Sequence, residues 1–351
     1  MSGLTITGSG RYLPGRAYTN DDLARVMETN DEWVRQRTGI AARHYCPEGV
    51  GVSDLALPAA QEALRAAGRS PEDVDYVLFN TMTPDHVFPG SAPLLATKLG
   101  CRGIPALDLR AQCAAMIYSL QLAHGLLGAG AARSILIVGA EAHAGFMPWR
   151  DWDVLEGTKN EKPSDADWQR ATRHRGLAVL FGDGAGAFLV EKSDRQDVGV
   201  LAVDLHSDGR FAGKLNIPAG FRTRPFISQR TVDEDLMIPT MDGREVFRQA
   251  IDLLPRSVRA VCATARVRLD QIDWFIAHQA NQRINDAVRE KLEVPKEKVP
   301  SNIERYGNTS AATIPILLDE MRRDGRLQEG QLVCFLALGA GIHWGSALLR
   351  V

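Results

Sequence analysis

A series of secondary-structure signals occurs twice along this chain, and this duplication limits the possible folds more than any other feature. The apolar run VDYVLFNT (74–81) is echoed by IDWFIAHQ (272–279). Each run is followed by a stretch of helical character, 91–99 in the first copy and 281–292 in the second. Short apolar runs that alternate with helical stretches are typical of α/β proteins with largely buried sheets.

The two copies keep nearly the same spacing over four elements. The segments IPALDL and KVPSNI come next, then a further helical stretch in each copy, and then SILIVGAE and QLVCFLALG. Ser134 lies 59 positions after Asp75, and the matching interval that starts at Asp273 is 58. We therefore predict an N-terminal half, 1–195, and a C-terminal half, 196–351, packed around a pseudo-twofold core. A functional site is expected where the halves meet.

The first copy carries a long charged insertion, at about 145–176, that the second copy lacks. It contains Trp149, Trp152 and Trp168, half of the six tryptophans of the chain, and a purely solvated loop rarely carries three. One interpretation is a surface excursion pinned by its tryptophans. The others are a cap over a substrate entrance and an arm that contacts a second subunit.

Charge and cysteine content exclude several classes of protein. The formal net charge of −2 argues against broad binding to nucleic acid or to a membrane surface. No apolar run is long enough to span a membrane, and the first residues do not form a signal peptide, so a cytoplasmic protein is expected. The five cysteines show no CxxC spacing and the histidines no HxxxH spacing, so neither a disulfide framework nor a metal site is expected.

Cys113 lies in RAQCAAM, where an apolar run gives way to a helical stretch. A free thiol has a pKa of about 8.5, and the N–H groups and dipole of a helix N-terminus can lower it. The sequence thus predicts a nucleophilic thiolate at a helix start. The alternative is a small buried hydrophobic side chain, which is the usual role of a single cysteine.

The second copy places two polar side chains at matched positions. His278 ends the run IDWFIA, and Asn308 precedes the helix that corresponds to the one opened by Cys113. Strand ends on one side of a sheet are where α/β folds build their sites, so we expect catalysis by these three residues. The glycines of ALGAGIHWGS predict backbone N–H groups for an oxyanion, and GDGAGA lacks the strand and helix context of a dinucleotide site.

The chain resembles the β-ketoacyl-acyl-carrier-protein synthase III family of the thiolase superfamily. The motifs that carry the resemblance, in order, are DEWVRQRTGI, DHVFPGSA, the cysteine motif, FGDGAGA, LHSDG, HQAN, YGNTSAA and WGSALLRV. The resemblance implies a homodimer with the five-layered αβαβα thiolase-like fold. It also implies an acyltransferase of fatty acid or polyketide biosynthesis that condenses an acyl-CoA with a malonyl-acyl-carrier-protein, with no metal or redox cofactor.

The same resemblance assigns roles to individual residues. Cys113 would hold the acyl group, and His278 and Asn308 would hydrogen-bond the malonyl thioester carbonyl. The backbone N–H groups of Cys113 and Ala340 would form an oxyanion hole. The remaining assignments are Trp33, Arg37 and Arg175 for coenzyme A, Arg248 and Arg283 for the phosphopantetheine or carrier protein, and Phe88, Met116 and Phe247 for the acyl pocket. Phe88 would reach across the dimer, and its size suggests a short acyl chain.

Three departures from the family pattern suggest an altered substrate. Ala115 and Ala340 stand where the family has glycine, and Met116 where phenylalanine is common. The insertion is also longer than usual. We therefore expect an altered acyl substrate or acceptor, as in a secondary-metabolite pathway. Two other functions remain open: acyl transfer from Cys113 to a hydroxyl, an amine or a second acyl thioester, and an inactive partner subunit.

Overall fold

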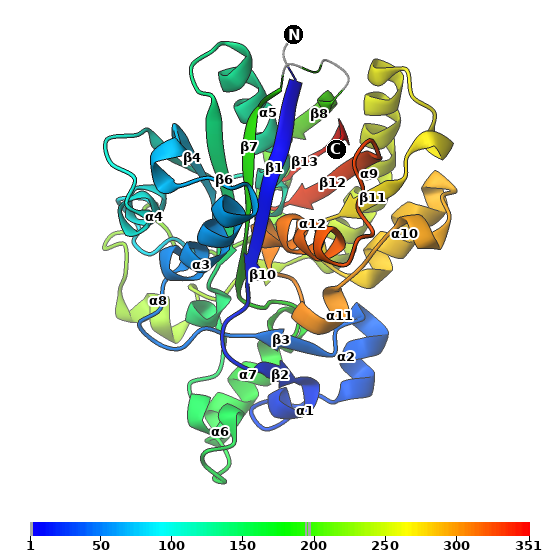
Figure 1. The fold of residues 1–351 in the computed structure, drawn as a ribbon. Helices are drawn as coiled ribbons and strands as arrows, with labels where there is room; N and C mark the ends of the chain where they lie inside the picture. The colour runs from blue at the N-terminus through cyan, green and yellow to red at the C-terminus, as the bar shows by residue number, and fades with distance from the viewer. Residues whose placement is uncertain (1–2, 194, 196–197) are drawn as a thin grey trace.

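The core of the molecule is built on two β-sheets (Figure 1). The computed structural model describes residues 3–193, 195 and 198–351. The first sheet has the strand order β1 (Gly3–Tyr12), β7 (Gly184–Ser193), β6 (Ser134–Glu141), β4 (Tyr76–Asn80), β5 (Ala106–Leu109). The second has the order β11 (Trp274–Ala277), β12 (Leu332–Gly339), β13 (His343–Arg350), β8 (Gly199–Ser207).

Helices cover both faces of each sheet and build five layers. Two helices, α5 (Ala115–Gly128) and α12 (Thr313–Arg323), lie between the sheets in an apolar core that includes Phe188 of β7 and Phe335 of β12. The outer layers are α3 (Val52–Ala66) with α4 (Ala92–Leu99) on the first sheet, and α9 (Gly243–Ala265) with α10 (Gln282–Leu292) on the second. The prediction of an αβαβα fold is confirmed, since burying both faces of both sheets requires three helical layers.

The duplication is visible in matching hydrogen bonds. The backbone N–H of Asp75 donates to the carbonyl of Ser134 at 3.0 Å, and that of Asp273 donates to the carbonyl of Leu332 at 2.9 Å. The Asp75 carboxylate accepts the Ser134 N–H at 3.2 Å, and the Asp273 carboxylate accepts the Leu332 N–H at 2.8 Å. In both halves, an aspartate just before the first parallel strand therefore hydrogen-bonds to the beginning of the neighbouring strand.

The halves differ at one sheet edge. The segment IPALDL contributes strand β5, whereas KVPSNI forms no strand and leads into the short helix α11 (Ile303–Tyr306). Pro300 has no N–H to give to a ladder. The side chain of Ser301 donates to Gln279 at 2.8 Å, and that of Asn302 donates to Glu320 at 2.9 Å. The polar groups of this segment thus bind the stretch just after β11 and helix α12 (Thr313–Arg323) instead of a neighbouring strand.

The insertion packs against an N-terminal excursion below the sheets (Figure 1). Its helices are α6 (Trp152–Glu156) and α7 (Asp165–Ala178), and the excursion holds β2 (Ala17–Thr19), α1 (Asn20–Leu23), α2 (Asp31–Thr38) and β3 (Ala42–His44). The ring centroids of Trp149 and Trp152 lie 5.7 and 5.5 Å from that of Tyr45. Two of the three tryptophans therefore pin the insertion, while Trp168 lies outside this cluster.

Candidate active site

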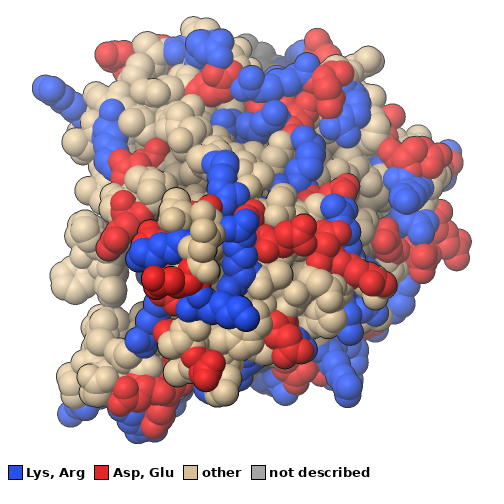
Figure 2. Space-filling model, turned by 90° about the horizontal axis from the view of Figure 1, so that it is seen from below, with Lys and Arg blue, Asp and Glu red and all other residues tan. Residues whose placement is uncertain are grey.

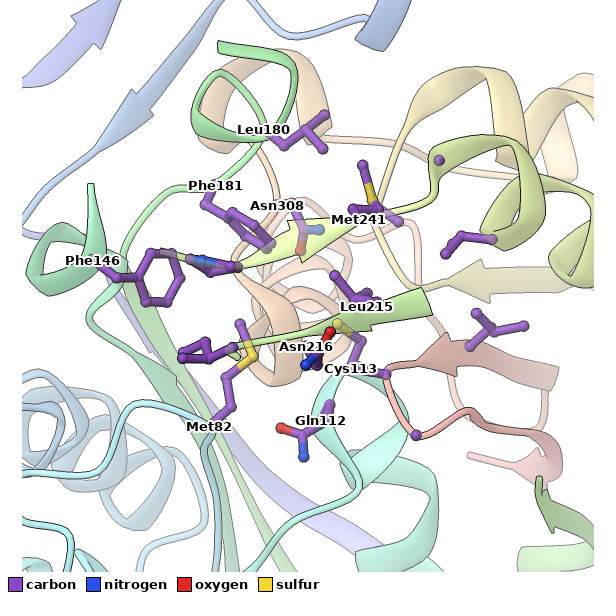
Figure 3. Close-up of a pocket in the computed structure, with 18 of the residues that line it drawn as sticks. Met82, Gln112, Cys113, Phe146, Leu180, Phe181, Leu215, Asn216, Met241 and Asn308 are labelled. Atoms are coloured by element: carbon purple, nitrogen blue, oxygen red, sulfur yellow. The ribbon is translucent and has the colours of Figure 1, made fainter. Parts of the chain in front are cut away.

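A large cavity, of about 1240 Å³, opens beside the place where the two halves meet, and it brings the three predicted catalytic residues together. Cys113, His278 and Asn308 all line it. Figure 3 shows Cys113 and Asn308 facing the same space. Cys113 comes from the turn that precedes α5, His278 follows β11 directly, and Asn308 lies five positions before α12. Each side chain therefore stands at a strand end or helix start.

Cys113 sits one residue after a strained backbone position. Gln112 has a φ of 50°, in the left-handed region, and opens the short 3₁₀ turn Gln112–Ala114. Burial raises the pKa of the Cys113 thiol to about 12; the hydrogen bond with Ser310 opposes this rise and the negative charge of Glu141 adds to it. The predicted lowering of this pKa is therefore wrong: the side chain is only 7% exposed, and loss of water outweighs the helix N-terminus.

The second half supplies a matching turn that meets the first. Ser310 has a φ of 48° and opens the 3₁₀ turn Ser310–Ala312, as Gln112 does in the first half. Its Oγ lies 3.3 Å from the Sγ of Cys113. Each turn rests on a glycine of the opposite half. A Cβ on Gly339 would lie 2.8 Å from the N of Cys113, and one on Gly139 would lie 2.3 Å from the O of Ala311.

The carboxamide of Asn308 is held with its amino group free for a ligand. Its Oδ1 accepts the backbone N–H of Ser310 at 2.8 Å, so Nδ2 is the end left to donate. The backbone of Asn308 donates to the carbonyl of Leu180 at 2.8 Å and accepts from Gly182 at 3.1 Å. The chain just after the insertion therefore holds this residue in place.

His278 is neutral at physiological pH because burial lowers its pKa to about 3. Its Nδ1 lies 2.7 Å from Oγ1 of Thr313, and that hydroxyl donates to the carbonyl of Ser310 at 2.9 Å. Among the described residues, nothing hydrogen-bonds to Nε2. The free site thus contains a neutral thiol and a neutral imidazole.

Ala340 also lines the cavity, directly after β12. It is not among the residues with positive φ, so its β-carbon introduces no backbone strain. A Cβ added to its neighbour Gly339 would lie 2.8 Å from the N of Cys113, so the backbones that carry the two predicted oxyanion donors lie close together.

The predicted coenzyme A residues form a cluster. The guanidinium carbon of Arg37 lies 4.5 Å from the Trp33 ring centroid, and that of Arg175 lies 4.9 Å from it. Asn30 caps α2: its side chain accepts the backbone N–H of Trp33 at 2.8 Å, which fixes the backbone that carries the tryptophan. Trp33 and Arg37 line the cavity, and Arg175 also donates to the carbonyl of Glu28.

Four predicted residues do not line the cavity: Arg175, which stacks on Trp33 beside it, and Met116, Arg248 and Phe88. Met116 is fully buried in the core between the sheets, because its position on α5 points into that layer. Arg248 donates to Glu245 of the same helix at 2.8 Å and does not line the cavity. Arg244, one turn earlier on α9, does line it. Phe88 is 80% exposed and does not line the cavity of its own chain. Arg283 and Phe247 do line it.

Sequence reasoning missed the residues that support the catalytic side chains and most of the cavity wall. Ser310 could have been found from the duplication, since its turn corresponds to that of Cys113. The apolar wall had no such signal, because its side chains come from irregular segments between the repeated elements, among them 212–241, which joins β8 to α9. The wall includes Met82, Phe146, Phe181, Leu215 of β9 (Leu215–Asn216) and Met241 of β10 (Thr240–Met241) (Figure 3).

Within the described residues, the structure offers neither a cluster of metal ligands nor a membrane-spanning helix. In the part of the chain that the structure describes, no three His, Cys, Asp or Glu side chains are grouped as metal ligands. Across 3–193, 195 and 198–351, no helix has the length and apolar character needed to cross a membrane.

Comparison with known proteins gives a consistent result over the full chain. Residues 262–351 match the family model of the 3-oxoacyl-[acyl-carrier-protein] synthase III C terminal, and residues 107–156 and 159–209 match that of 3-oxoacyl-[acyl-carrier-protein] synthase III. Two β-ketoacyl-[acyl-carrier-protein] synthases III are similar. The one from Bordetella petrii is 40% identical over 100% of this chain and 99% of its own, and the one from a Synechococcus species is 41% identical over 99% and 96%.

Solved structures agree with these relatives. The 3-oxoacyl-[acyl-carrier-protein] synthase III from Aquifex aeolicus superposes with a TM-score of 0.85 at 36% identity, covering 99% of this chain and 100% of that one. The priming β-ketosynthase from the R1128 polyketide biosynthetic pathway superposes with a TM-score of 0.83 at 29% identity, covering 99% and 96%.

Proposed function

This chain belongs to the 3-oxoacyl-[acyl-carrier-protein] synthase III family of condensing acyltransferases, and we propose that Cys113, His278 and Asn308 carry out its reaction. The reaction joins an acyl group from an acyl-CoA to a malonyl-acyl-carrier-protein, with loss of carbon dioxide, in fatty acid or polyketide synthesis. The observation that carries the proposal is the convergence of these three side chains, from both halves, on one cavity.

In the first step, Cys113 takes the acyl group from coenzyme A. The sulfur forms a bond to the acyl carbon, the bond from that carbon to the coenzyme A sulfur breaks, and the thiol proton ends on the departing coenzyme A. The N–H groups of Cys113 and Ala340 are suited to the oxyanion that forms, since both residues line the cavity and the backbones that carry them lie close together.

In the second step, the malonyl thioester loses carbon dioxide and leaves an enolate. Its carbon attacks the acyl carbon on Cys113, the bond to sulfur breaks, and the thiolate takes up one proton. The orientation of Asn308, with Nδ2 free to donate, suits the enolate oxygen. No metal or redox cofactor is needed, because the developing charge is on oxygen and hydrogen-bond donors can stabilise it.

Arginines around the cavity support binding of phosphate and acidic groups. Arg37, Arg110, Arg244 and Arg283 line it, and within the described part of the chain Arg244 and Arg283 have no acidic partner. Figure 2 shows Lys and Arg side chains gathered near the centre of the face seen from below, with acidic side chains between them. We assign Trp33, Arg37 and Arg175 to coenzyme A, and Arg244 and Arg283 to the pantetheine and carrier protein.

We also propose a cytoplasmic homodimer that forms through the edge of the first sheet. Strand β5 is an edge strand, and its Leu107 is 45% exposed. Asp108 of β5 accepts the backbone N–H groups of Ser91 and Ala92 at 2.7 and 2.6 Å, which fixes the loop carrying the exposed Phe88 beside this edge. An exposed, partly apolar edge strand is a surface for pairing with another chain. Phe88 is then available to the partner's acyl pocket.

The proposal is tested by following the mass of the intact protein. With a mixture of acyl-CoA thioesters, we expect one acyl group on Cys113 and none in Cys113→Ala. Adding malonyl-acyl-carrier-protein to the acyl-enzyme is expected to release a β-ketoacyl product. A Cys113→Ala variant that still condenses would contradict the mechanism. An acyl-enzyme that reacts only with a hydroxyl, an amine or a second acyl thioester would instead identify a transferase with another acceptor.

A further inference from the structure

The contacts of His278 determine which of its nitrogens carries the proton in the free enzyme. The hydroxyl of Thr313 has one proton, and the carbonyl of Ser310, 2.9 Å away, can only accept it. The oxygen of Thr313 is then the acceptor for the second contact, at 2.7 Å, so Nδ1 of His278 must donate. This arrangement satisfies all three buried groups. It leaves Nε2 with a lone pair and, among the described residues, without a hydrogen-bond partner.

This tautomer suits the first half-reaction, acylation of Cys113. It does not suit the second, in which the malonyl thioester is decarboxylated and condensed. A lone pair on Nε2 can accept the proton of the Cys113 thiol, which stays on the sulfur at neutral pH because burial raises the pKa of that thiol. A lone pair facing an enolate oxygen would repel it. For His278 to donate to the malonyl carbonyl beside Asn308, the proton must instead be on Nε2.

We propose that Thr313 is a positioning residue whose hydroxyl sets the tautomer of His278 and switches it between the two half-reactions. When the hydroxyl donates to Ser310, Nε2 is a base for Cys113. When the hydroxyl turns to donate to Nδ1, Nε2 carries the proton and becomes a donor. The second setting gives up one buried hydrogen bond, to the Ser310 carbonyl, and gains the hydrogen bond to the substrate. This inference rests on the proposed condensation.

Protons balance in both settings. During acylation, Nε2 takes the thiol proton of Cys113, and the imidazolium then returns it to the coenzyme A sulfur as that bond breaks. Between the half-reactions one proton enters at Nε2 and one leaves from Nδ1, both exchanged with solvent, so the charge of the imidazole is unchanged. During decarboxylation, Nε2–H donates a hydrogen bond and keeps its proton.

A purely structural role for Thr313 is the competing explanation. Threonine hydroxyls on helices often donate to a carbonyl three or four residues earlier, as Thr97 of α4 does to Pro93 at 2.9 Å. Such a bond contributes stability and does not discriminate between half-reactions. Thr97→Val is therefore the matched control, since it removes the same kind of bond from an exposed site outside the cavity.

The test combines ¹⁵N NMR of labelled histidine with separate measurement of the half-reactions. In the wild type we expect the free-enzyme His278 proton on Nδ1. In Thr313→Val we expect it on Nε2, because His278 lines the cavity, where an Nε2–H can donate to water, whereas an Nδ1–H would face the valine side chain without an acceptor. Acylation of Cys113 by acyl-CoA is expected to slow by at least about tenfold, while condensation from preloaded acyl-enzyme changes by less than about threefold. Thr313→Ser is expected to restore both the tautomer and acylation.

Two outcomes overturn the inference. One is a proton on Nε2 in the wild-type free enzyme, which needs no variant and so does not depend on the folding of Thr313→Val. The other is a Thr313→Val enzyme that keeps the wild-type tautomer and slows both half-reactions equally, as a structural bond would. If the tautomers are as expected but no malonyl condensation occurs, the proposed function fails while the control of His278 by Thr313 stands.

Discussion

At the scale of single residues, the free site holds its nucleophile in a protonated and unreactive form. Burial raises the pKa of Cys113 to about 12 and lowers that of His278 to about 3, so the pair is neutral over the physiological range. A helix N-terminus is present, but burial of the thiol is the dominant effect on its pKa. Activation must therefore come with substrate or from the neighbouring imidazole, which limits reactions of the thiol in the absence of acyl-CoA.

The state of Cys113 can be measured by ultraviolet absorbance of the thiolate. The folded pKa lies above the ordinary value of 9.0, so the folded protein keeps a proton that the unfolded chain loses, and stability falls as pH rises from about 9 toward 12. We expect the difference between wild type and Cys113→Ser to show no thiolate absorbance up to pH 9. A titration step near pH 7 in this difference would contradict the assignment.

Asn308 offers a second residue-scale prediction. Because its Oδ1 is bound to the Ser310 N–H, only Nδ2 is available to the enolate. Asn308→Asp keeps the acceptor and removes the donor, so decarboxylation is expected to slow by about 100-fold or more, while acylation of Cys113 changes little. The measurement is release of labelled carbon dioxide from malonyl-carrier-protein by preloaded enzyme. Equal slowing of acylation would show that Asn308 supports the fold of the site rather than the enolate.

At the scale of elements, two glycines decide how closely the turns of the two halves approach the strands on which they rest. Gly339 ends β12 against the backbone of Cys113, and Gly139 lies near the end of β6 against the backbone of Ala311. Neither glycine has a positive φ, so the requirement is for space. Backbone atoms at 2.8 and 2.3 Å from an added Cβ cannot yield as a flexible side chain would.

Gly339→Ala is therefore expected to displace the Cys113 turn. We expect acylation to fall by at least about tenfold and the free energy of unfolding to fall by about 1–3 kcal/mol, the usual effect of overpacking. Gly125→Ala is the control, since Gly125 lies within α5 with open space around it. It is expected to leave acylation unchanged and to add up to about 1 kcal/mol of stability. Urea unfolding and intact-protein mass give both quantities, and wild-type acylation by Gly339→Ala would refute this account.

Elements with a periodic or repeated pattern were predictable, and contacts between elements were not. The nearly equal spacing of the elements after Asp75 and after Asp273 predicted where the strands lie. It therefore also predicted that Cys113, His278 and Asn308 stand at strand ends or helix starts. The same register did not reveal that KVPSNI forms no strand, because that depends on side-chain bonds to Gln279 and Glu320. Burial of Met116 and the ion pair of Arg248 likewise depend on which side of a helix faces the core, which a motif does not specify.

At the scale of the whole molecule, the exposed edge strand β5 of the first sheet is the surface that we expect a second chain to cover. Leu107 and Phe88 are 45% and 80% exposed at this edge. The proposed dimer would cover both and extend the sheet across two chains. The cavity has an apolar wall near Cys113, and a partner's Phe88 would shorten the space beyond it.

Leu107→Asp tests the proposed dimer edge. A charge buried at a chain-to-chain edge without a partner is strongly unfavourable, so we expect the variant to be monomeric at micromolar concentration by light scattering after gel filtration, and to lose activity. Tyr12→Asp is the control, since Tyr12 is 38% exposed on β1, the opposite edge strand of the same sheet. It is expected to remain dimeric. A wild-type mass equal to one chain would contradict the dimer itself.

Each of the two turns packs against a glycine of the opposite half, and this arrangement has a consequence for how such proteins can diverge. Cys113 rests on Gly339 from the other half, and Ala311 rests on Gly139 from the first. A hybrid gene that joins the front of one relative to the back of another would therefore combine a nucleophile from one lineage with a platform shaped by a different one. Exchange or redesign of one half alone would therefore require the facing turn or glycine of the other half to be refitted.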